Sequence, residues 1–442
     1  SAKQIINRVM KKCPNNFKIV EQDHSGAQRA RNFGYEHAKG DYLVFFDSDC
    51  IIEPDSAKTW VDQFEKNPDI GFVYSGYKFL DEMGAIPSEK FDLFTLRVRN
   101  YISSCFPLRR EFYTGWNENL KSLQDWDFWL SVAEKGAKGK FLEGYAFSTA
   151  YPSGESISAK GCTNEVWLER VDAVKAAHRL PERSVCVSSL GSRHEGIWLA
   201  KLIDADYQDI PNGKPHRYKT IIQVGFSPMP GRVEHHASIF NDAKVKRVLF
   251  WTCDDITAIC TMISLNAVWK YTALLNGGVK QFVEDKAAYD LMRRAGFEVE
   301  ILPLPVATCD PAKLPEKLKF AVDISPAYNF LFELLQKSLP DVELEPIGQS
   351  VNLDNVLGLA HFHPDKTISA GMKRTILAGR SVVSNVQAPF MGFVDDNQNI
   401  DIFLPQVAEK IRELAYGGPP KSARDYYVSL VDTQNLKEIV HV

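Results

Sequence analysis

Short apolar runs alternate with amphipathic stretches along the whole chain. Near its start, the spacing of apolar residues predicts a helix over residues 27–39 that is closed by Gly40. The apolar run over residues 41–46 predicts a buried strand, and a second helix and strand follow at residues 57–66 and 70–75. This alternation is typical of an α/β fold, so we expect a mixed, mainly parallel sheet.

The hydrophobic pattern blurs over residues 90–113 and resumes with two amphipathic helices at residues 123–135 and 167–178. It restarts near residue 180, where we place a domain boundary. Strand-like runs then alternate with helical stretches again, and a charged connector near residue 315 separates two small α/β lobes. The expected parts are one domain and two Rossmann-like lobes, over residues 1–180, 181–315 and 316–442.

Composition narrows the class of protein without identifying it. The length of 442 residues suggests about three domains of ordinary size. Lys and Arg number 52 against 56 Asp and Glu, and the net charge of −4 argues against general nucleic-acid binding. We find no apolar stretch long enough for a transmembrane segment, no signal-peptide core and no CxxC pair. We therefore expect a cytoplasmic location, with peripheral association at a membrane left open.

Two carboxylates directly follow the first apolar run, in the triplet Asp47-Ser48-Asp49. Side chains two residues apart on a strand face the same side, so both carboxylates could lie at the ligand-binding end of a sheet. Their oxygens suit Mg²⁺ or Mn²⁺. A solvated turn is the alternative interpretation. Haloacid-dehalogenase phosphatases open on a similar pattern, but Ile51 stands where they have Thr or Val, so we rank that interpretation low.

The residues around the triplet carry a family resemblance. The chain reads GAQRARNFG from Gly26, AKGDY from Ala38 and FDSD from Phe46. This series strongly resembles the inverting family-two nucleotide-sugar glycosyltransferases of GT-A fold, and the resemblance extends over about residues 17–160. It implies a GT-A-like domain that uses a nucleotide-sugar donor, with a UDP-sugar favoured.

The same resemblance implies which residues meet the donor. Asp47 and Asp49 would hold the cation, Mn²⁺ or Mg²⁺, and through it the donor diphosphate. Gly26 lies at a helix N-terminus, whose free amides can bind an anion. Arg31 would either approach the same phosphates or pin an aspartate of the motif.

A second acidic segment lies further along, where the chain reads GWNENL and, after three residues, QDWDFWL. The family has a similar segment in which one aspartate is the general base, and the resemblance assigns this role to Asp125. Asp127 cannot share a helical face with Asp125, so we expect a supporting or capping role for it. Gln124 stands where the family has Glu. Trp116 and Gln124 are candidates for acceptor contacts or for support of the site.

The chain also departs from the family pattern. By comparison with the family, the sequence starts past the first βα unit, so we expect either that the sequence is incomplete at its start or that this unit is missing. The residues that hold the nucleobase therefore cannot be named. Many relatives place a histidine near the metal in the loop that corresponds to residues 151–158, and this chain has none there.

Residues 181–442 resemble, more faintly, a compact GT-B glycosyltransferase of two Rossmann-like lobes. The helix-turn-strand segment MKRTILAGRSVVSN, which begins at Met372, carries part of this resemblance. Lys373 and Arg374 occupy its helix and could meet a donor diphosphate or an anionic acceptor, as a second site. The alternative is a non-catalytic scaffold, because no acidic residue stands where the class holds the donor ribose.

The sequence as a whole favours a metal-dependent, inverting glycosyltransferase. It would transfer a sugar from a nucleotide-sugar to a hydroxyl of a glycan, a glycolipid or another acceptor. The alternative function is a non-catalytic carbohydrate-recognition or assembly module that has lost donor binding.

Overall fold

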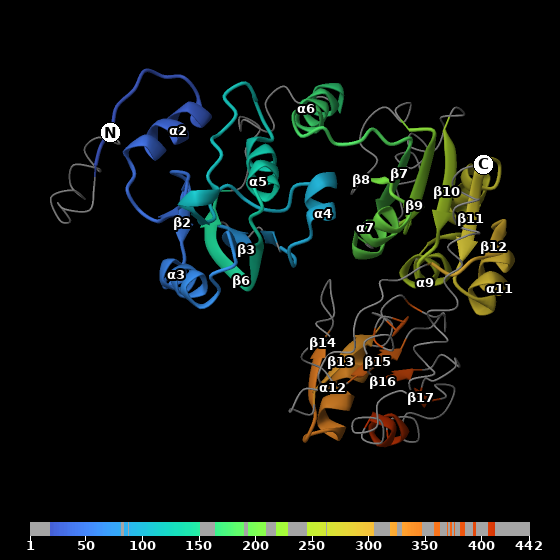
Figure 1. Ribbon diagram of the computed structural model, residues 1–442. Helices are drawn as coiled ribbons and strands as arrows, with labels where there is room; N and C mark the ends of the chain where they lie inside the picture. The colour runs from blue at the N-terminus through green and yellow to red at the C-terminus, as the bar shows by residue number, and fades with distance from the viewer. Residues whose placement is uncertain are drawn as a thin grey trace. The chain divides into compact units, whose positions relative to one another are not determined.

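The chain divides into two compact units, Ser1–Glu182 and Arg183–Val442, which are described separately (Figure 1). The structure is a computed structural model, and it describes residues 18–80, 84–86, 88–150, 164–189, 193–208, 218–228, 245–261, 263–304, 319–324, 329–346, 358–362, 369, 372–373, 375, 381–384, 392–394 and 405–411.

The first unit is built on one mixed sheet. Its described strands follow the order β1-β5-β3-β6-β2, and β4 pairs with β3. They are β1 Tyr42–Leu43, β2 Cys50–Ile52, β3 Phe72–Phe79, β4 Ala85–Ile86, β5 Leu108–Arg109 and β6 Gly139–Thr149. The expected α/β class is confirmed. Among these strands, parallel pairing is confined to β3 with β6, and the other pairs are antiparallel.

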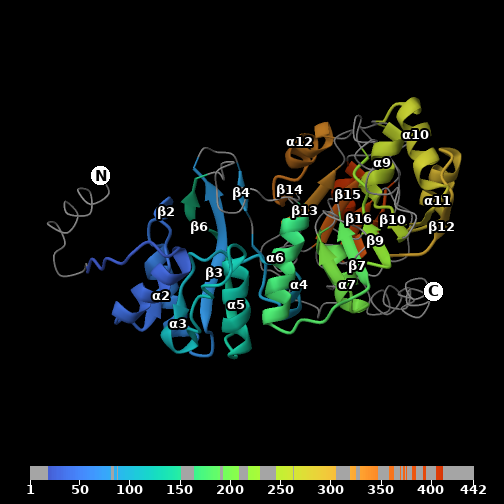
Figure 2. The ribbon, with the colours of Figure 1, turned by 90° about the horizontal axis from the view of Figure 1, so that it is seen from above.

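Helices flank this sheet, and a capping side chain explains where one of them, α4, begins. They are α2 Ala27–His37, α3 Ser56–Lys66, α4 Leu93–Val98, α5 Gln124–Glu134 and α6 Asn164–Ala177, with a 3₁₀ turn at Arg110–Phe112. Helix α4 starts after Asp92, whose carboxylate accepts a hydrogen bond from the Phe94 amide at 3.3 Å. Helix α3 buries Trp60 and Phe64, which share one face because they are four residues apart. Figure 2 shows α3 and α5 on either side of β3.

The core of the first unit is rich in aromatic residues. The rings of Phe72 on β3 and Trp129 on α5 lie 4.8 Å apart between centroids, and both side chains are fully buried. Two indole N–H groups also fix α5 to the segment before β5: Trp126 donates to the Leu96 carbonyl at 2.6 Å, and Trp129 donates to the Ser103 carbonyl at 3.0 Å. Buried indoles need such partners, so these bonds set the position of α5.

The strand expected over residues 41–46 is much shorter in the structure. Only Tyr42–Leu43 pairs, with β5, and the chain is irregular from Val44 to Asp47. Val44 is 44% exposed and Phe46 is 36% exposed, so this run is not buried as expected. The physical reason is that β1 lies at the edge of the described sheet. Apolar content predicts a strand but does not tell an edge from a centre.

The second unit contains two wholly parallel sheets among its described strands. The first has the order β12-β11-β10-β9-β7-β8 and the second the order β14-β13-β15-β16-β17. The strands of the first sheet are β7 Val185–Ser189, β8 Asp206–Gln208, β9 Thr220–Val224, β10 Lys246–Phe250, β11 Val279–Val283 and β12 Val299–Ile301. Those of the second are β13 Lys319–Ile324, β14 Glu343–Pro346, β15 Gly358–Phe362, β16 Ser381–Ser384 and β17 Gly392–Phe393.

Helices connect the strands of both sheets in the manner of α/β units. They are α7 Arg193–Leu202, α9 Cys253–Thr261, α10 Leu265–Leu275, α11 Lys286–Arg294 and α12 Asn329–Ser338, with a further helical segment at residues 405–411. The expected pair of Rossmann-like lobes matches these two sheets. No helix in the described part of the chain is long and apolar enough to cross a bilayer.

A buried histidine fastens α6 to α5. His178, just beyond α6, contacts Asp127 through Nε2 at 3.1 Å and Glu134 through Nδ1 at 3.0 Å. Only an imidazolium can donate from both ring nitrogens at once. Burial lowers the pKa of His178, but the hydrogen bonds to Asp127 and Glu134 outweigh it and raise the pKa above the ordinary value. We therefore infer a charged His178 that ties the two helices together.

This pairing predicts a pH-dependent stability. Because the folded-state pKa of His178 is raised, its contribution is present below the unfolded pKa of about 6.5 and is lost as the pH rises through the folded pKa. His178→Gln should cost about 1.5–3 kcal/mol of unfolding free energy at pH 6 and less at pH 9. Urea unfolding of the full chain, read by pulse-labelling hydrogen exchange in α5 and α6, measures this. His37→Gln is the control, and equal losses at both pH values would contradict the prediction.

Candidate active site

The Asp47-Ser48-Asp49 triplet forms a tight turn. Asp47 ends the irregular segment after β1, Ser48 and Asp49 lie in the turn, and the Cys50 amide donates back to the Asp47 carbonyl at 3.2 Å. Asp47 is partly exposed and Asp49 is exposed. Strand alternation, from which the sequence argument placed both carboxylates on one side, therefore does not apply at Asp49.

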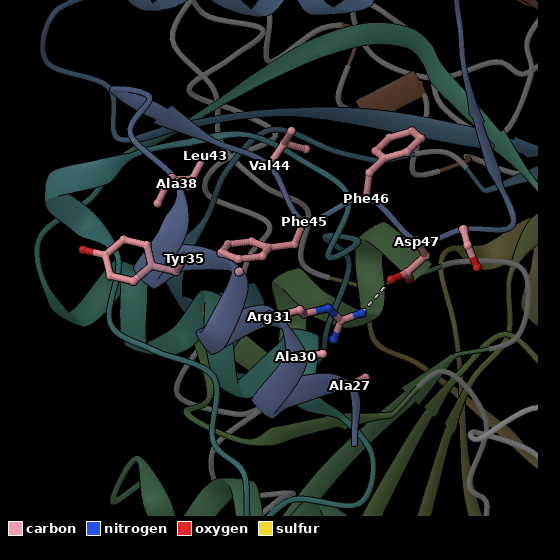
Figure 3. Close-up of a pocket in the computed structure, with 12 residues that line it drawn as sticks. Ala27, Ala30, Arg31, Tyr35, Ala38, Leu43, Val44, Phe45, Phe46 and Asp47 are labelled. Carbon is pink, nitrogen blue, oxygen red and sulfur yellow. Dashed lines mark hydrogen bonds and ion pairs between the residues drawn. The ribbon is translucent and has the colours of Figure 1, made fainter. Parts of the chain in front are cut away.

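Arg31 on α2 holds the first aspartate of this turn. Its Nη2 lies 2.7 Å from Asp47 Oδ1, as the dashed line in Figure 3 shows. Of the two roles expected for Arg31, the structure contains the contact with a motif aspartate. The Arg31 side chain is only 15% exposed and that of Asp47 is 43% exposed, so the ion pair lies at the border between protein and solvent.

The Trp116 ring packs against the Arg31 guanidinium. The Arg31 guanidinium carbon lies 4.4 Å from the centroid of the Trp116 ring, and the Phe128 ring from α5 stacks on Trp116 at 4.2 Å and 2°. Two groups this close to one centroid must cover opposite faces of the ring. Trp116 is 2% exposed. Of the two roles expected for Trp116, an acceptor contact through stacking on its ring does not fit this arrangement, because neither face of the ring is open. Its place is that of a support for Arg31.

Asn32, the next residue on α2, orders the loop that carries Trp116. Its Oδ1 accepts from the Trp116 amide at 2.7 Å and from the Tyr113 hydroxyl at 2.6 Å. Its Nδ2 donates to the Trp116 carbonyl and to Glu118 Oε1, both at 2.9 Å. All hydrogen-bonding positions of one amide are thus used in joining α2 to residues 113–118.

A hollow of about 440 Å³ lies between α2 and residues 43–48 (Figure 3). Its lining is mainly apolar, with Arg31, Asp47 and Ser48 as its polar members. Phe45 points toward α2, whereas Val44 and Phe46 point the other way. The volume lies in the range of small-molecule sites, and the polar side chains gather at the Asp47 side.

Asp125 lies in the first turn of α5. Its Oδ2 accepts from Asn100 Nδ2 at 2.7 Å, and its Oδ1 accepts from the Trp126 amide at 3.0 Å. Burial raises the pKa of Asp125, while the hydrogen bonds from Trp126 and Asn100 and the nearby charge of Arg31 act in the opposite direction. Burial thus disfavours the charged carboxylate, and these three groups favour it.

The other two residues singled out on this helix have different surroundings. Gln124 is the first residue of α5 and is partly exposed. Asp127 is buried and faces His178, away from the partners of Asp125. Gly26 precedes α2 and has a backbone φ of +93°, a value that residues other than glycine rarely adopt. The turn into the helix therefore depends on this glycine.

The residues at the turn fit a hard cation only in part. Asp47 and Asp49 offer carboxylate oxygens, which Mg²⁺ and Mn²⁺ prefer. One oxygen of Asp47 is already paired with Arg31. Over the described ranges, no three His, Cys, Asp or Glu side chains come together to hold a metal ion. These carboxylate oxygens would suit a cation that takes its remaining ligands from water and from a bound diphosphate.

In the second unit, Lys373 does not lie free for an anion. It is 3% exposed, and its Nζ lies 2.5 Å from Glu284 Oε1 and 2.7 Å from the carbonyl oxygen of Leu304. The ammonium therefore joins the helical residues 372–373 to the ends of β11 and β12, which corrects the expected diphosphate contact. Arg374 lies outside the described residues.

Sequence reasoning missed the contacts that two residues, Asn100 and Phe128, make at the site. Asn100 belongs to no motif, and only its contact with Asp125 reveals it. The stacking of Phe128 on Trp116 was equally hidden, since both residues are ordinary core aromatics by composition. The i, i+3 spacing of Asp125 and Phe128 on α5 was the available signal that one helix carries both.

Comparison with known families agrees with the N-terminal motifs. Residues 1–120 match the model of the family described as Glycosyl transferase family 2, which confirms the resemblance found in the sequence. An uncharacterized glycosyltransferase of Haemophilus influenzae is 26% identical over 158 residues, or 32% of this chain and 52% of that protein. A chondroitin synthase of Escherichia coli is 25% identical over 128 residues, or 27% of this chain and 18% of that protein. The chain thus spans about half or less of the length of these relatives.

Two solved structures show a distant likeness to the chain. A sucrose-phosphate synthase from Thermosynechococcus elongatus has a TM-score of 0.38 at 8% identity, covering 58% of this chain and 96% of that one. TarM of S. aureus has a TM-score of 0.35 at 14% identity, covering 50% of this chain and 54% of that one. TM-scores this low do not establish the fold of the second unit, which its own two parallel sheets define.

The hydrogen bonds of Asn32 predict that the stability of the first unit depends on this residue. Asn32→Ala leaves the Trp116 amide and carbonyl and the Tyr113 hydroxyl without this partner, which should destabilise the first unit by about 1–3 kcal/mol. Asn32→Asp should cost more, because a carboxylate would face the Trp116 carbonyl and Glu118. Urea unfolding of the full chain, with hydrogen exchange read at residues 113–118, tests both. Similar stability of Asn32→Asp and the wild type would contradict this account.

Proposed function

We propose that the first unit is a glycosyltransferase that moves a sugar from a nucleotide-sugar, with a UDP-sugar favoured, to a hydroxyl of a glycan or another acceptor. The observation that carries the proposal is the place of Arg31 between the two acidic motifs. Its guanidinium is paired with Asp47 and is near enough to Asp125 to oppose the rise of that carboxyl's pKa. The family match over residues 1–120 and the glycosyltransferase relatives support the same class of reaction.

In this proposal the donor diphosphate lies over the Asp47-Ser48-Asp49 turn. Bound to Asp47 and Asp49, Mn²⁺ or Mg²⁺ would neutralise the charge of the leaving diphosphate. Arg31 and the free amides at the N-terminus of α2, after Gly26, add positive charge on the other side. The ion pair of Arg31 with Asp47 keeps the guanidinium in place before the donor arrives.

Asp125 acts as the general base in a single displacement. Its carboxylate takes the proton of the acceptor hydroxyl while the hydroxyl oxygen attacks the anomeric carbon, which inverts the configuration there. Burial raises the pKa of Asp125 toward the working pH, and this makes the carboxylate a better proton acceptor. The hydrogen bonds from Asn100 and the Trp126 amide oppose this rise in pKa and favour the charged carboxylate.

The alternative is a carbohydrate-recognition or assembly module without turnover. The engagement of one Asp47 oxygen by Arg31 favours it, because that oxygen is then unavailable to a cation unless the pair rearranges. Release of UDP from UDP-sugars in the presence of Mn²⁺ separates the two functions: an enzyme of this class hydrolyses or transfers its donor slowly even without its natural acceptor, and a recognition module does neither.

The cation proposal predicts the effect of removing one ligand. Asp49→Ala should abolish donor binding and turnover, because the cation loses a fixed oxygen. The measurement is UDP release and donor titration with Mn²⁺, over a panel of UDP-sugars. Asp69→Ala, an exposed aspartate in the same unit, is the matched control. Full turnover by Asp49→Ala, or by the wild type in excess EDTA, would refute metal dependence.

The base proposal predicts a different pattern. Asp125→Asn should leave donor affinity unchanged and slow transfer by roughly 10²–10⁴-fold, the usual contribution of a general base. Single-turnover rates and donor titrations of the full chain, with Asp69→Asn as control, separate chemistry from binding. Transfer at a near-normal rate would move the base elsewhere, with Asp127 as the next residue to test.

A further inference from the structure

Asn100 forms a hydrogen bond with the carboxyl of Asp125. It lies just after α4, its Nδ2 donates to Asp125 Oδ2 at 2.7 Å, and its Oδ1 accepts from the Ile102 amide at 3.2 Å. The Ile102 amide can only donate, so it fixes the orientation of the Asn100 side chain. The NH₂ group must then face Asp125.

The backbone on both sides of Asn100 is anchored. Arg99 is paired with Glu89 and lies 5.5 Å from the centre of the Tyr101 ring. The Tyr101 hydroxyl accepts from the Asp92 amide at 3.0 Å, and the Tyr74 hydroxyl donates to the Glu89 carbonyl at 2.7 Å. Because both neighbours of Asn100 are anchored, its side chain loses little conformational entropy when it forms its hydrogen bond.

The helix that carries Asp125 is fixed to the same segment. Trp126 donates to the Leu96 carbonyl and Trp129 to the Ser103 carbonyl, one on each side of Asn100 in the sequence. Asp125 directly precedes Trp126 on α5, so both partners of the Asn100 contact are next to residues held by these bonds. Neither partner can move far without breaking one of them.

We propose that Asn100 is a positioning residue for the reaction: it holds the Asp125 carboxylate in one orientation and in its charged form. The inference rests on the proposed function, in which Asp125 is the base. An asparagine suits this task because its amide donates a hydrogen bond but does not take up the proton that the base must accept. The second oxygen of Asp125 is held by the Trp126 amide, and each oxygen keeps a lone pair for the acceptor hydroxyl.

The groups that face Asp125 set the direction of the expected pH effect. Arg31 from α2 and Asn100 favour the carboxylate, burial disfavours it, and Tyr77 on β3 is near enough for its own pKa to be raised by Asp125. On α5 itself, Asp127 faces His178 instead. Loss of the Asn100 hydrogen bond should therefore raise the pKa of Asp125.

The test compares Asn100→Ala and Asn100→Asp with the wild type as full chains. The probes are UDP-glucose, UDP-N-acetylglucosamine and UDP-glucuronic acid with Mn²⁺, and the readout is UDP release across pH. Asn100→Ala should lower kcat about 10–100-fold with KM for the donor nearly unchanged, and should move the acid limb of the profile to higher pH. Asn100→Asp should move it further, because a second carboxylate faces the first. Asn67→Ala, which loses a hydrogen bond at the end of α3, should change neither.

A second measurement keeps the inference testable without turnover. The carboxyl of Asp125 can be titrated by ¹³C NMR in aspartate-labelled protein, with Asp125→Asn used to assign its signal. Its pKa should rise in Asn100→Ala and stay unchanged in Asn67→Ala. An unmoved pKa, or an equal loss of kcat at every pH, would overturn the inference and leave Asn100 a structural role only. Normal turnover by Asp125→Asn would instead refute the proposed base, whatever the Asn100 variants do.

Discussion

The ion pair between Arg31 and Asp47 is the contact on which the geometry of the first unit's site depends. The guanidinium is held in three ways at once: by the Asp47 carboxylate, by the face of Trp116, and through Trp116 by Phe128 on α5. Helix α2, the acidic turn and helix α5 therefore meet at one side chain. Moving any of them would separate Arg31 from Asp47 or from the Trp116 ring, so these contacts together fix how the three elements are arranged.

This arrangement also explains why the two carboxylates in the site differ. Asp47 is partly exposed and has an ion-pair partner, so it is a charged ligand that can exchange partners. Asp125 has hydrogen-bond donors around it and a guanidinium nearby, but burial raises its pKa. One fold thus provides a partly exposed, ion-paired carboxylate and a separate carboxyl whose pKa is raised by burial. Different environments give chemically identical side chains different roles.

The sequence predicted what depends on local pattern and missed what depends on tertiary contacts. Helices α2 and α5 and the alternation of the second unit follow from periodicity, and the contact of Arg31 with Asp47 was one of two roles that the family resemblance implied. The contact of Asn100 with Asp125 could not be predicted, because it joins two elements whose packing no local signal fixes. The strand after Gly40 was overestimated for a similar reason, since its apolar run does not reveal that it lies at an edge.

A basic residue near a helix is weak evidence for an anion site until its partners are known, and two residues of this chain show why. Lys373 is 3% exposed and its partner Glu284 is 12% exposed, so replacing Glu284 with an incoming anion would leave a buried carboxylate without a cation. That cost of several kcal/mol makes the pair a structural link. Asp47, the partner of Arg31, is 43% exposed, so water or a cation can take the place of Arg31 beside it at little cost. The difference in burial of the acidic partner, which the sequence does not display, is what separates an exchangeable site from a fixed one.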